Sequence, residues 1–259
     1  MFCGVKFMAE VAKIVSSDKT VLLPDMNAGC TLEQSCPPER FRAFRELHPD
    51  HIALTYINCS AEVKALSDII VTSSNAEAII RQIPESQKII FAPDKYLGGY
   101  LIRKTGREML LWEGTCAVHE QFSEKELVKL RHRHPQAHII AHPECPEALL
   151  RYAEHIGSTR SLIDFTKQNA GREFIVLTEP GIIHQMKKAY PESIFHDVPG
   201  MGEGACATCN TCPFMKLNTL EKLYVCMRDR APAIAMSAAL MDAARKPLLR
   251  MLEMSPPAR

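Results

Sequence analysis

The sequence lacks an excess of charge, a long apolar run and the layout of a signal peptide. Its 259 residues contain 31 Lys and Arg against 30 Asp and Glu, a formal net charge of +1. That balance argues against a nucleic acid or a membrane surface as an electrostatic partner. No apolar run approaches the roughly 20 residues needed to cross a bilayer, and Lys6, Glu10 and Lys13 interrupt the apolar N-terminal stretch. We expect a cytoplasmic protein of ordinary globular composition.

Cysteine, in contrast, is abundant, with ten in the chain. In a short secreted protein such a number indicates a disulfide framework, but this chain is too long and too helical to need one. Ligation of a metal or cluster, or catalysis, is the better explanation. Histidine is also frequent, and we expect His132, His134 and His138 to lie on a solvated surface.

Short apolar runs alternate with amphipathic stretches along the chain. This alternation predicts an α/β fold built from crossover units. The expected buried parallel strands are 19–24, 51–57, 68–73, 88–93, 137–142 and 173–178. The expected helices are 38–48, 60–67, 75–83, 123–133, 146–155 and 160–168, followed by a long C-terminal helix over about 229–253 that Pro247 kinks.

A shift of about 86 residues brings two parts of the chain into register. The aligned pairs are Cys30 with Cys116, Tyr56 with His142, Asn58 with Glu144, and Ser73 with Thr159. The repeat predicts four segments: residues 1–45 as the second half of a first αβα repeat, 46–131 as a second repeat, 132–226 as a third, and 227–259 as a C-terminal helix. A chance alignment of two αβ units is the alternative.

Each repeat contributes a candidate thiolate. These are Cys30, Cys116 and one cysteine of the CxxCxxC run, which contains Cys206, Cys209 and Cys212. Three thiolates suit a [4Fe-4S] cluster in which one iron has no protein ligand and acts as a Lewis acid. A structural zinc site and redox-active thiols are the alternatives, although zinc usually shows a second pair of closely spaced ligands.

Polar residues follow the expected strands 51–57 and 137–142. Tyr56 and Asn58 have i, i+2 spacing and therefore share a face, as do His142 and Glu144. Open α/β sheets bind ligands at the carboxyl ends of their strands, and a histidine with a carboxylate can exchange protons there. The alternative is a His-Pro turn that packs for structural reasons.

Two hydroxyl-rich turns precede expected helices. Ser73 lies in TSSNA and Thr159 in GSTRS. Helix N-termini bind phosphate and carboxylate groups through backbone amides, so the repeat register favours anion binding. Ordinary N-capping is the alternative.

Several motifs, taken together, resemble the quinolinate synthase family. They are LLPDMNAGCTLEQSCP (22–37), YINCSAEVKALSDIIVTSSNA (56–76), WEGTCAVHE (112–120), AHPECP (141–146), GSTRSL (157–162), TEPGI (178–182) and CATCNTCPFMKLNTLEKL (206–223). The resemblance implies three αβα repeats around a pseudo-threefold axis and a transferase of NAD biosynthesis. It also implies cluster ligation by Cys30, Cys116 and Cys212, which leaves Cys206 and Cys209 free to form a disulfide.

The activity implied by the resemblance is condensation of iminoaspartate with dihydroxyacetone phosphate to quinolinate, with loss of phosphate and two waters. Iminoaspartate would come from L-aspartate oxidase or aspartate dehydrogenase. The matching residues imply roles: Glu144, His142 and Tyr56 in catalysis, and Tyr56, Asn58, Ser73, His142, Glu144 and Thr159 in substrate binding. No match exists to the family's N-terminal HxY and GDSL-like motifs, so the chain as written is expected to bind a cluster poorly and turn over slowly. An iron–sulfur hydro-lyase and a non-catalytic zinc protein are the other candidate functions.

Overall fold

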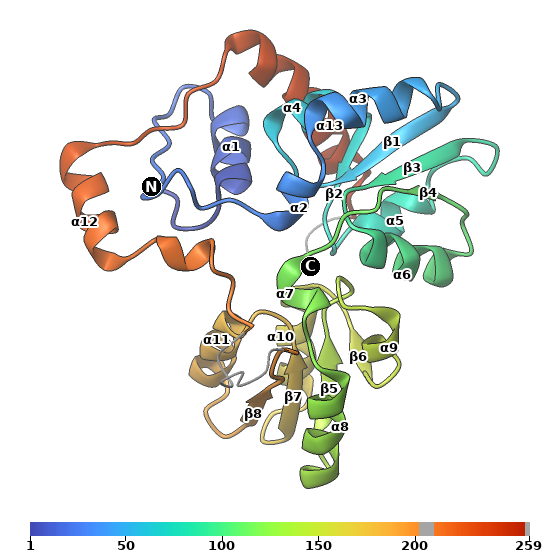
Figure 1. Ribbon diagram of the computed structural model, residues 1–259, viewed down its shortest axis with the longest axis vertical. Helices are drawn as coiled ribbons and strands as arrows, with labels where there is room; N and C mark the ends of the chain where they lie inside the picture. Colours follow the sequence, from blue (N-terminus) through green and yellow to red (C-terminus); the bar gives the residue numbers. More distant parts are fainter. Residues whose placement is uncertain (202–209, 257–259) are drawn as a thin grey trace. The chain divides into compact units, whose positions relative to one another are not determined.

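The computed structural model describes residues 1–201 and 210–256. The chain forms two compact units (Figure 1). Unit 1 contains Met1–Thr115 and the chain from Pro213 onward, and unit 2 contains Cys116–Cys212. Each unit is built on its own four-stranded parallel sheet.

The sheet of unit 1 has the order β2 (Ile69–Val71), β1 (His51–Tyr56), β3 (Lys88–Ala92), β4 (Leu110–Leu111). Its central strands are apolar on both faces because helices cover both. Ala53 and Ile90 face a cluster that includes Phe41 of α3 (Pro38–Glu46) and Val63 of α4 (Ala61–Ala65).

Helix α6 (Lys95–Thr105) packs against β3 and β4, and α5 (Ala76–Ile80) lies beside it. A Cβ on Gly98 of α6 would lie 2.9 Å from Cδ1 of Phe91 and 2.6 Å from Cδ2 of Leu111. Glycine therefore allows the helix to approach the sheet closely.

The ends of the chain complete unit 1. Helix α13 (Ala238–Met254) packs on α4, β2, α5 and α1 (Lys6–Val15). The Arg245 guanidinium donates to the Ile14 carbonyl at 2.9 Å, which ties α13 to the end of α1. Two further helices are α2 (Thr31–Ser35) and α12 (Leu220–Asp229), and a 3-10 turn, η1, spans Met215–Leu217.

The sheet of unit 2 has the equivalent order β6 (His155–Ile156), β5 (His138–Ala141), β7 (Glu173–Leu177), β8 (Ile194–Asp197). Leu162 of α10 (Thr159–Gln168) and Met186 of α11 (Gly181–Ala189) pack with Phe174 and Val176 of β7. Before the sheet come α7 (Ala117–Glu120) and α8 (Glu124–Arg133), and α9 (Glu147–Leu150) follows β5.

The two units repeat the same sequence of elements at an offset of about 86 residues. In unit 1 the order is α2, α3, β1, α4, β2, α5, β3, α6, β4. In unit 2 it is α7, α8, β5, α9, β6, α10, β7, α11, β8. The α/β class and its crossover connections are therefore confirmed.

Three expected elements differ from the structure. Residues 19–24 form no parallel strand; Leu22 makes only an isolated antiparallel bridge with Ala233. The helix expected from residue 229 begins at Ala238 because Arg230 adopts a positive φ of 52° and the following residues run beside Leu22. The helix expected over 146–155 ends at Leu150, and His155 begins β6.

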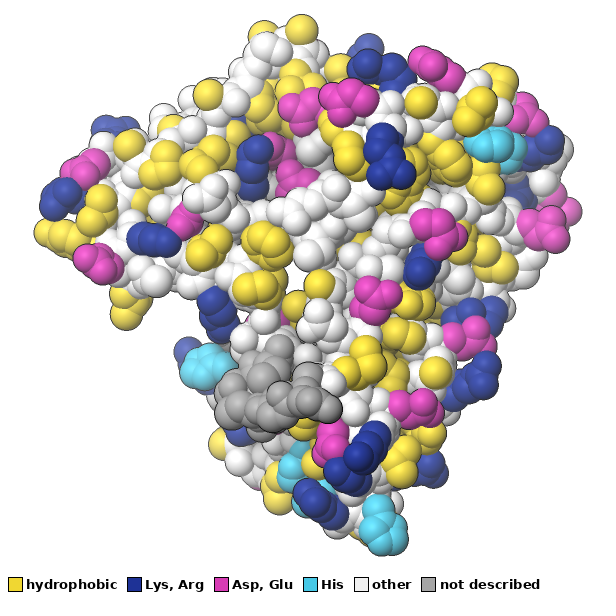
Figure 2. All heavy atoms as spheres, viewed as in Figure 1, with side chains coloured by type: hydrophobic (Ala, Val, Ile, Leu, Met, Phe, Trp, Pro, Cys, Tyr) yellow, Lys and Arg dark blue, Asp and Glu magenta, His cyan; other side chains and the backbone are white. Residues whose placement is uncertain are grey.

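Within the part of the chain that is described, no helix is both long and apolar enough to span a membrane. On the face shown in Figure 2, Lys and Arg side chains are interspersed with Asp and Glu, in keeping with the net charge of +1.

Candidate functional site

Short helix α7 presents a thiol and an imidazole on one side. Cys116 is the N-cap residue of α7, and its carbonyl accepts from the Glu120 amide at 2.9 Å. His119 follows three positions later, and residues three apart are neighbours on a helix surface. Local helical geometry therefore brings the Cys116 thiol beside the His119 ring.

The carboxyl ends of two adjacent strands supply the other polar groups. His142 and Glu144 follow β5, and Thr178 follows β7. The His142 amide donates to the Leu177 carbonyl at 3.0 Å, so the two strand ends stay paired beyond the sheet. Glu144 thus lies at the edge where parallel sheets bind ligands.

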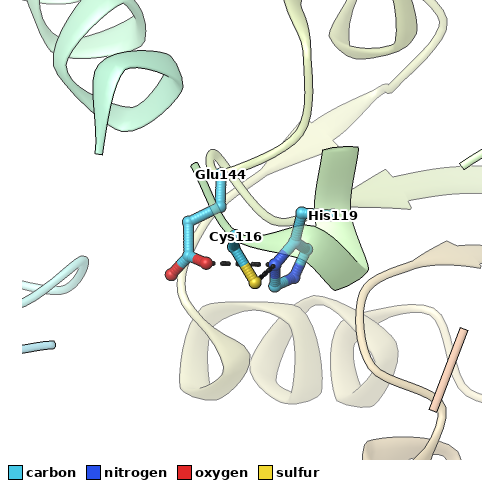
Figure 3. Close-up of side chains that lie close together, drawn as sticks. All are labelled: Cys116, His119 and Glu144. Carbon is cyan, nitrogen blue, oxygen red and sulfur yellow. Dashed lines mark hydrogen bonds and ion pairs between the residues drawn. The ribbon is translucent and has the colours of Figure 1, made fainter. Parts of the chain in front are cut away.

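The His119 ring connects these groups (Figure 3). Its Nδ1 lies 3.1 Å from the Cys116 Sγ and 3.0 Å from the Glu144 Oε2. Its Nε2 lies 3.0 Å from the Thr178 Oγ1. A carboxylate oxygen accepts hydrogen bonds, so the His119 Nδ1 fits as the donor toward the Glu144 Oε2.

Burial sets the protonation state of the neighbouring His142. His119, His142 and Glu144 are each less than a tenth exposed. Burial is the main cause that lowers the pKa of His142 to about 4; Glu144 opposes the shift, and the nearby His119 adds to it. The His142 Nδ1 lies 3.6 Å from the Glu144 Oε1. His142 is therefore neutral at physiological pH.

The ligand atoms of Cys116, His119 and Glu144 all lie within 4.8 Å of one another. Thiolate, imidazole and carboxylate are all metal ligands, and the thiolate is the softest of the three. These three side chains can therefore hold a metal, move a proton, or do both. Thr178 was absent from the residues selected on sequence, and His119 was noted there only within the motif WEGTCAVHE (112–120), without a role. The i, i+3 spacing from Cys116 was the signal for His119, and the position directly after a buried strand was the signal for Thr178.

Exposure separates the cysteines into groups. Cys30, Cys116 and Cys212, the three expected ligands, are each partly exposed. Cys3 is exposed, and the remaining described cysteines are buried: Cys36, Cys59, Cys145 and Cys226. Burial raises the pKa of Cys59 to about 11, so this thiol stays protonated. Cys206 and Cys209 lie outside the described residues.

Cys212 is positioned by Glu179. The Cys212 amide donates to the Glu179 Oε1 at 3.3 Å, and the Gly181 amide donates to the Oε2 at 2.7 Å. A single carboxylate thus joins the start of α11 to the last cysteine of the CxxCxxC run.

Unit 1 carries Cys30, Tyr56, Asn58 and Ser73. Cys30 is the N-cap residue of α2, the position that Cys116 has in α7. Tyr56 ends β1 and is buried, whereas Asn58 is partly exposed. Ser73 follows β2 and is also partly exposed.

The two hydroxyl-rich turns are only partly alike. In the first, Thr72 and Asn75 side chains accept backbone amides at 3.3 and 2.6 Å. In the second, Ser158 caps α10 by accepting from the Ser161 amide at 3.3 Å. Thr159, the first residue of α10, is exposed.

These features define a class of protein: an α/β protein whose repeated units place thiols at helix starts, with a buried imidazole and carboxylate at the carboxyl edge of a sheet. Comparison with known proteins specifies the family. The family model described as Quinolinate synthetase A protein matches residues 1–253. The quinolinate synthase of Chloroherpeton thalassium is 58% identical over 255 residues, which cover 98% of this chain and 79% of that protein.

Other relatives agree. The quinolinate synthase of Trichormus variabilis is 57% identical, with 98% of this chain and 78% of the relative covered. That of Ehrlichia chaffeensis is also 57% identical, with 98% and 81% covered. The chain belongs to the quinolinate synthase family, whose members are enzymes of NAD biosynthesis. The family predicted from the motifs is confirmed.

Proposed function

We propose that this protein condenses iminoaspartate with dihydroxyacetone phosphate to form quinolinate, releasing phosphate and two waters. The observation that carries this proposal is the arrangement of the partly exposed Cys116 thiol beside the buried side chains of His119 and Glu144. It combines a soft metal ligand with proton-transfer groups, as a family that dehydrates its substrates requires. The iminoaspartate would come from L-aspartate oxidase or aspartate dehydrogenase, and a cytoplasmic location is part of the same proposal.

The cysteine chemistry fits a [4Fe-4S] cluster held by Cys30, Cys116 and Cys212. All three thiols are partly exposed, whereas most other described thiols are buried, and burial raises the pKa of Cys59 and Cys226. Such a cluster, when bound, supplies an iron that lacks a protein thiolate and acts as a Lewis acid toward substrate oxygen or nitrogen.

Glu144 and His142 are suited to different tasks in proton transfer. The Glu144 carboxylate is held by the His119 ring at 3.0 Å, which fixes one oxygen and leaves the other toward His142. We assign Glu144 as general base and acid. His142, neutral because burial lowers its pKa to about 4, can hold a polar group of the substrate without adding charge.

The remaining residues would bind the substrates. We propose that Tyr56 and Asn58 orient the intermediate, with Tyr56 also taking part in catalysis, and that Ser73 and Thr159 receive phosphate or carboxylate groups. The exposed position of Thr159 leaves its hydroxyl accessible to a ligand.

We also propose that the units follow a pseudo-threefold pattern. The equivalent strand orders of the two sheets support the repeat. The order α1, residues 19–24, α2 parallels α6, β4, α7. Residues 1–45 would accordingly be the second half of a further repeat, with 46–131 and 132–226 as the other two and 227–259 as the C-terminal helical segment.

The test is quinolinate formation under anaerobic conditions, after reconstitution with iron and sulfide. Glu144→Gln keeps the shape of the side chain but removes its basicity, and we expect the rate to fall by about 100-fold or more with the cluster spectrum retained. Glu154→Gln, an exposed residue of unit 2, is the matched control. An unchanged rate in Glu144→Gln would contradict the assignment of Glu144.

The same sample distinguishes the other candidate functions. Zinc in place of iron and sulfide would indicate a structural zinc protein. A cluster-loaded protein that dehydrates a small hydroxy acid but forms no quinolinate would indicate a hydro-lyase.

A further inference from the structure

Two imidazoles converge on one carboxylate oxygen at a second place in unit 2. The His134 Nδ1 lies 2.8 Å from the Glu173 Oε1, and the His196 Nε2 lies 2.7 Å from the same oxygen. The two rings are stacked, with centroids 4.0 Å apart and an angle of 29° between their planes. His134, expected on a solvated surface, is therefore part of an organised cluster.

Three separate elements bring these side chains together. His134 is the C-cap residue of α8, Glu173 is the first residue of β7, and His196 lies in β8. The strand register pairs His196 with Ile175, two positions from Glu173. His196 and Glu173 consequently lie on the same face of the sheet, because side chains alternate along a strand.

This cluster is distinct from the site around His119. Glu173 begins β7, whereas Thr178 follows the end of the same strand. Five residues of extended strand separate the two positions by roughly 16 Å. The cluster therefore lies toward the opposite end of β7 and contributes nothing to the chemistry proposed above.

The donor set has the character of a metal site. Two histidines and one carboxylate are ligands that zinc uses in sites that keep an open position for water. The three side chains are 29%, 26% and 22% exposed for His134, Glu173 and His196 respectively, so water and an ion can reach them.

We propose that His134, Glu173 and His196 form a binding site for a divalent cation of the zinc type, with water as a further ligand. The three ligand atoms lie within 4.8 Å of one another. Ligands around tetrahedral zinc are roughly 3.3 Å apart, given bonds of about 2.0 to 2.1 Å. The two nitrogens lie 2.8 and 2.7 Å from the carboxylate oxygen, so binding of the ion would require each of them to move away from it by roughly 0.5 Å. The ion would link the end of α8 to strands β7 and β8.

The experiment is equilibrium dialysis of the full chain, reconstituted with iron and sulfide, against buffered Zn²⁺. Bound zinc is measured for the parent and for His134→Gln, Glu173→Gln and His196→Gln. The cysteines are the same in every sample, so zinc bound to them is a common background. We expect each variant to lose one equivalent of zinc per chain relative to the parent. His132→Gln, an exposed histidine on the same helix, is the matched control and should bind as the parent does.

A second measurement separates ligation from simple hydrogen bonding. Glu173→Gln keeps the size of the side chain and one acceptor oxygen but loses the charge. Zinc should raise the melting temperature of the parent and of His132→Gln more than that of Glu173→Gln, because a ligand stabilises the state that binds it. Equal zinc content and equal zinc-dependent shifts across all variants would overturn the proposal and leave a hydrogen-bonded cluster only.

Discussion

The His119 Nδ1 lies 3.0 Å from the Glu144 Oε2, so an imidazole from a short helix orients a carboxylate at the end of a strand. The same nitrogen is 3.1 Å from the Cys116 Sγ. The His119 Nδ1 therefore contacts both Cys116, the proposed cluster ligand, and Glu144, the proposed proton-transfer group. On the far side of the ring, the Thr178 hydroxyl holds Nε2 at 3.0 Å, which makes Thr178 a positioning residue.

Thr178→Val should loosen this arrangement while keeping the shape of the side chain. Both the loss of the hydroxyl and the unpaired Nε2 should lower the free energy of unfolding, by about 1–2 kcal/mol. Because the His119 ring is no longer fixed, we also expect the rate of quinolinate formation to fall about tenfold. Urea unfolding and a steady-state assay measure the two effects.

Thr166→Val is the control for that variant. Thr166 is equally buried in unit 2, and its hydroxyl donates to the Leu162 carbonyl at 3.0 Å, away from His119. It should lose stability and retain its rate per folded molecule. If the two valine variants lose the same fraction of activity, Thr178 has only a structural role.

Glu179→Ala should weaken the hold on Cys212. The carboxylate accepts from the amides of Cys212 and Gly181, at 3.3 and 2.7 Å. Without the carboxylate, the Cys212 backbone loses this hydrogen bond and the cysteine is held less firmly. We therefore expect less iron per chain after reconstitution. Glu179→Gln retains one acceptor and should lose less. Iron content that stays at the parent value in both variants would argue against this role.

Glu33 should make the stability of unit 1 depend on pH. Its Oε2 is buried without a hydrogen-bond partner among the described residues. Burial, followed by the nearby Glu10, raises the pKa of Glu33 from 4.5 to about 7. The folded protein thus keeps a proton that the unfolded chain releases between these values, so the free energy of unfolding falls as the pH rises through this window.

Glu33→Gln removes that titration. We expect it to be more stable than the parent at about pH 8, by up to about 3 kcal/mol, with the difference disappearing below about pH 4.5. Glu39→Gln, an exposed carboxylate in α3, changes the charge equally and should show no such trend. Denaturant unfolding over this pH range gives the answer, and parallel curves for parent and Glu33→Gln would contradict it.

Much of the fold could be predicted from the sequence because its central strands are continuous apolar runs. Strands β1, β3, β5 and β7 are of this kind. Three edge strands, β4, β6 and β8, were missed, and residue 155 of β6 had been assigned to a helix. Leu110 and Leu111 form too short a run, and His196 and Asp197 make β8 polar. Residues 19–24 have the apolar composition of a strand but find only a single bridging partner, which no local pattern reveals.

The site was predictable where its residues recur in the repeat. Glu144 and His142 follow β5 at the expected edge, and Cys116 begins a helix as Cys30 does. Thr178 was missed, and His119 was given no role, because their counterparts in the aligned segment are not of the same type. Their roles depend on a contact between residues 59 positions apart in the chain. Such a contact is set by tertiary packing rather than by a motif.

The most direct test of the account is the visible spectrum and the iron and sulfide content of anaerobically reconstituted Cys30→Ala, Cys116→Ala and Cys212→Ala, with Cys226→Ala, a buried thiol, as control. We predict that each of the three ligand variants loses the absorbance at about 400 nm and contains fewer than four irons per chain. The spectrum and iron content of Cys226→Ala should equal those of the parent. A full four-iron cluster in any one of the three ligand variants would contradict the account.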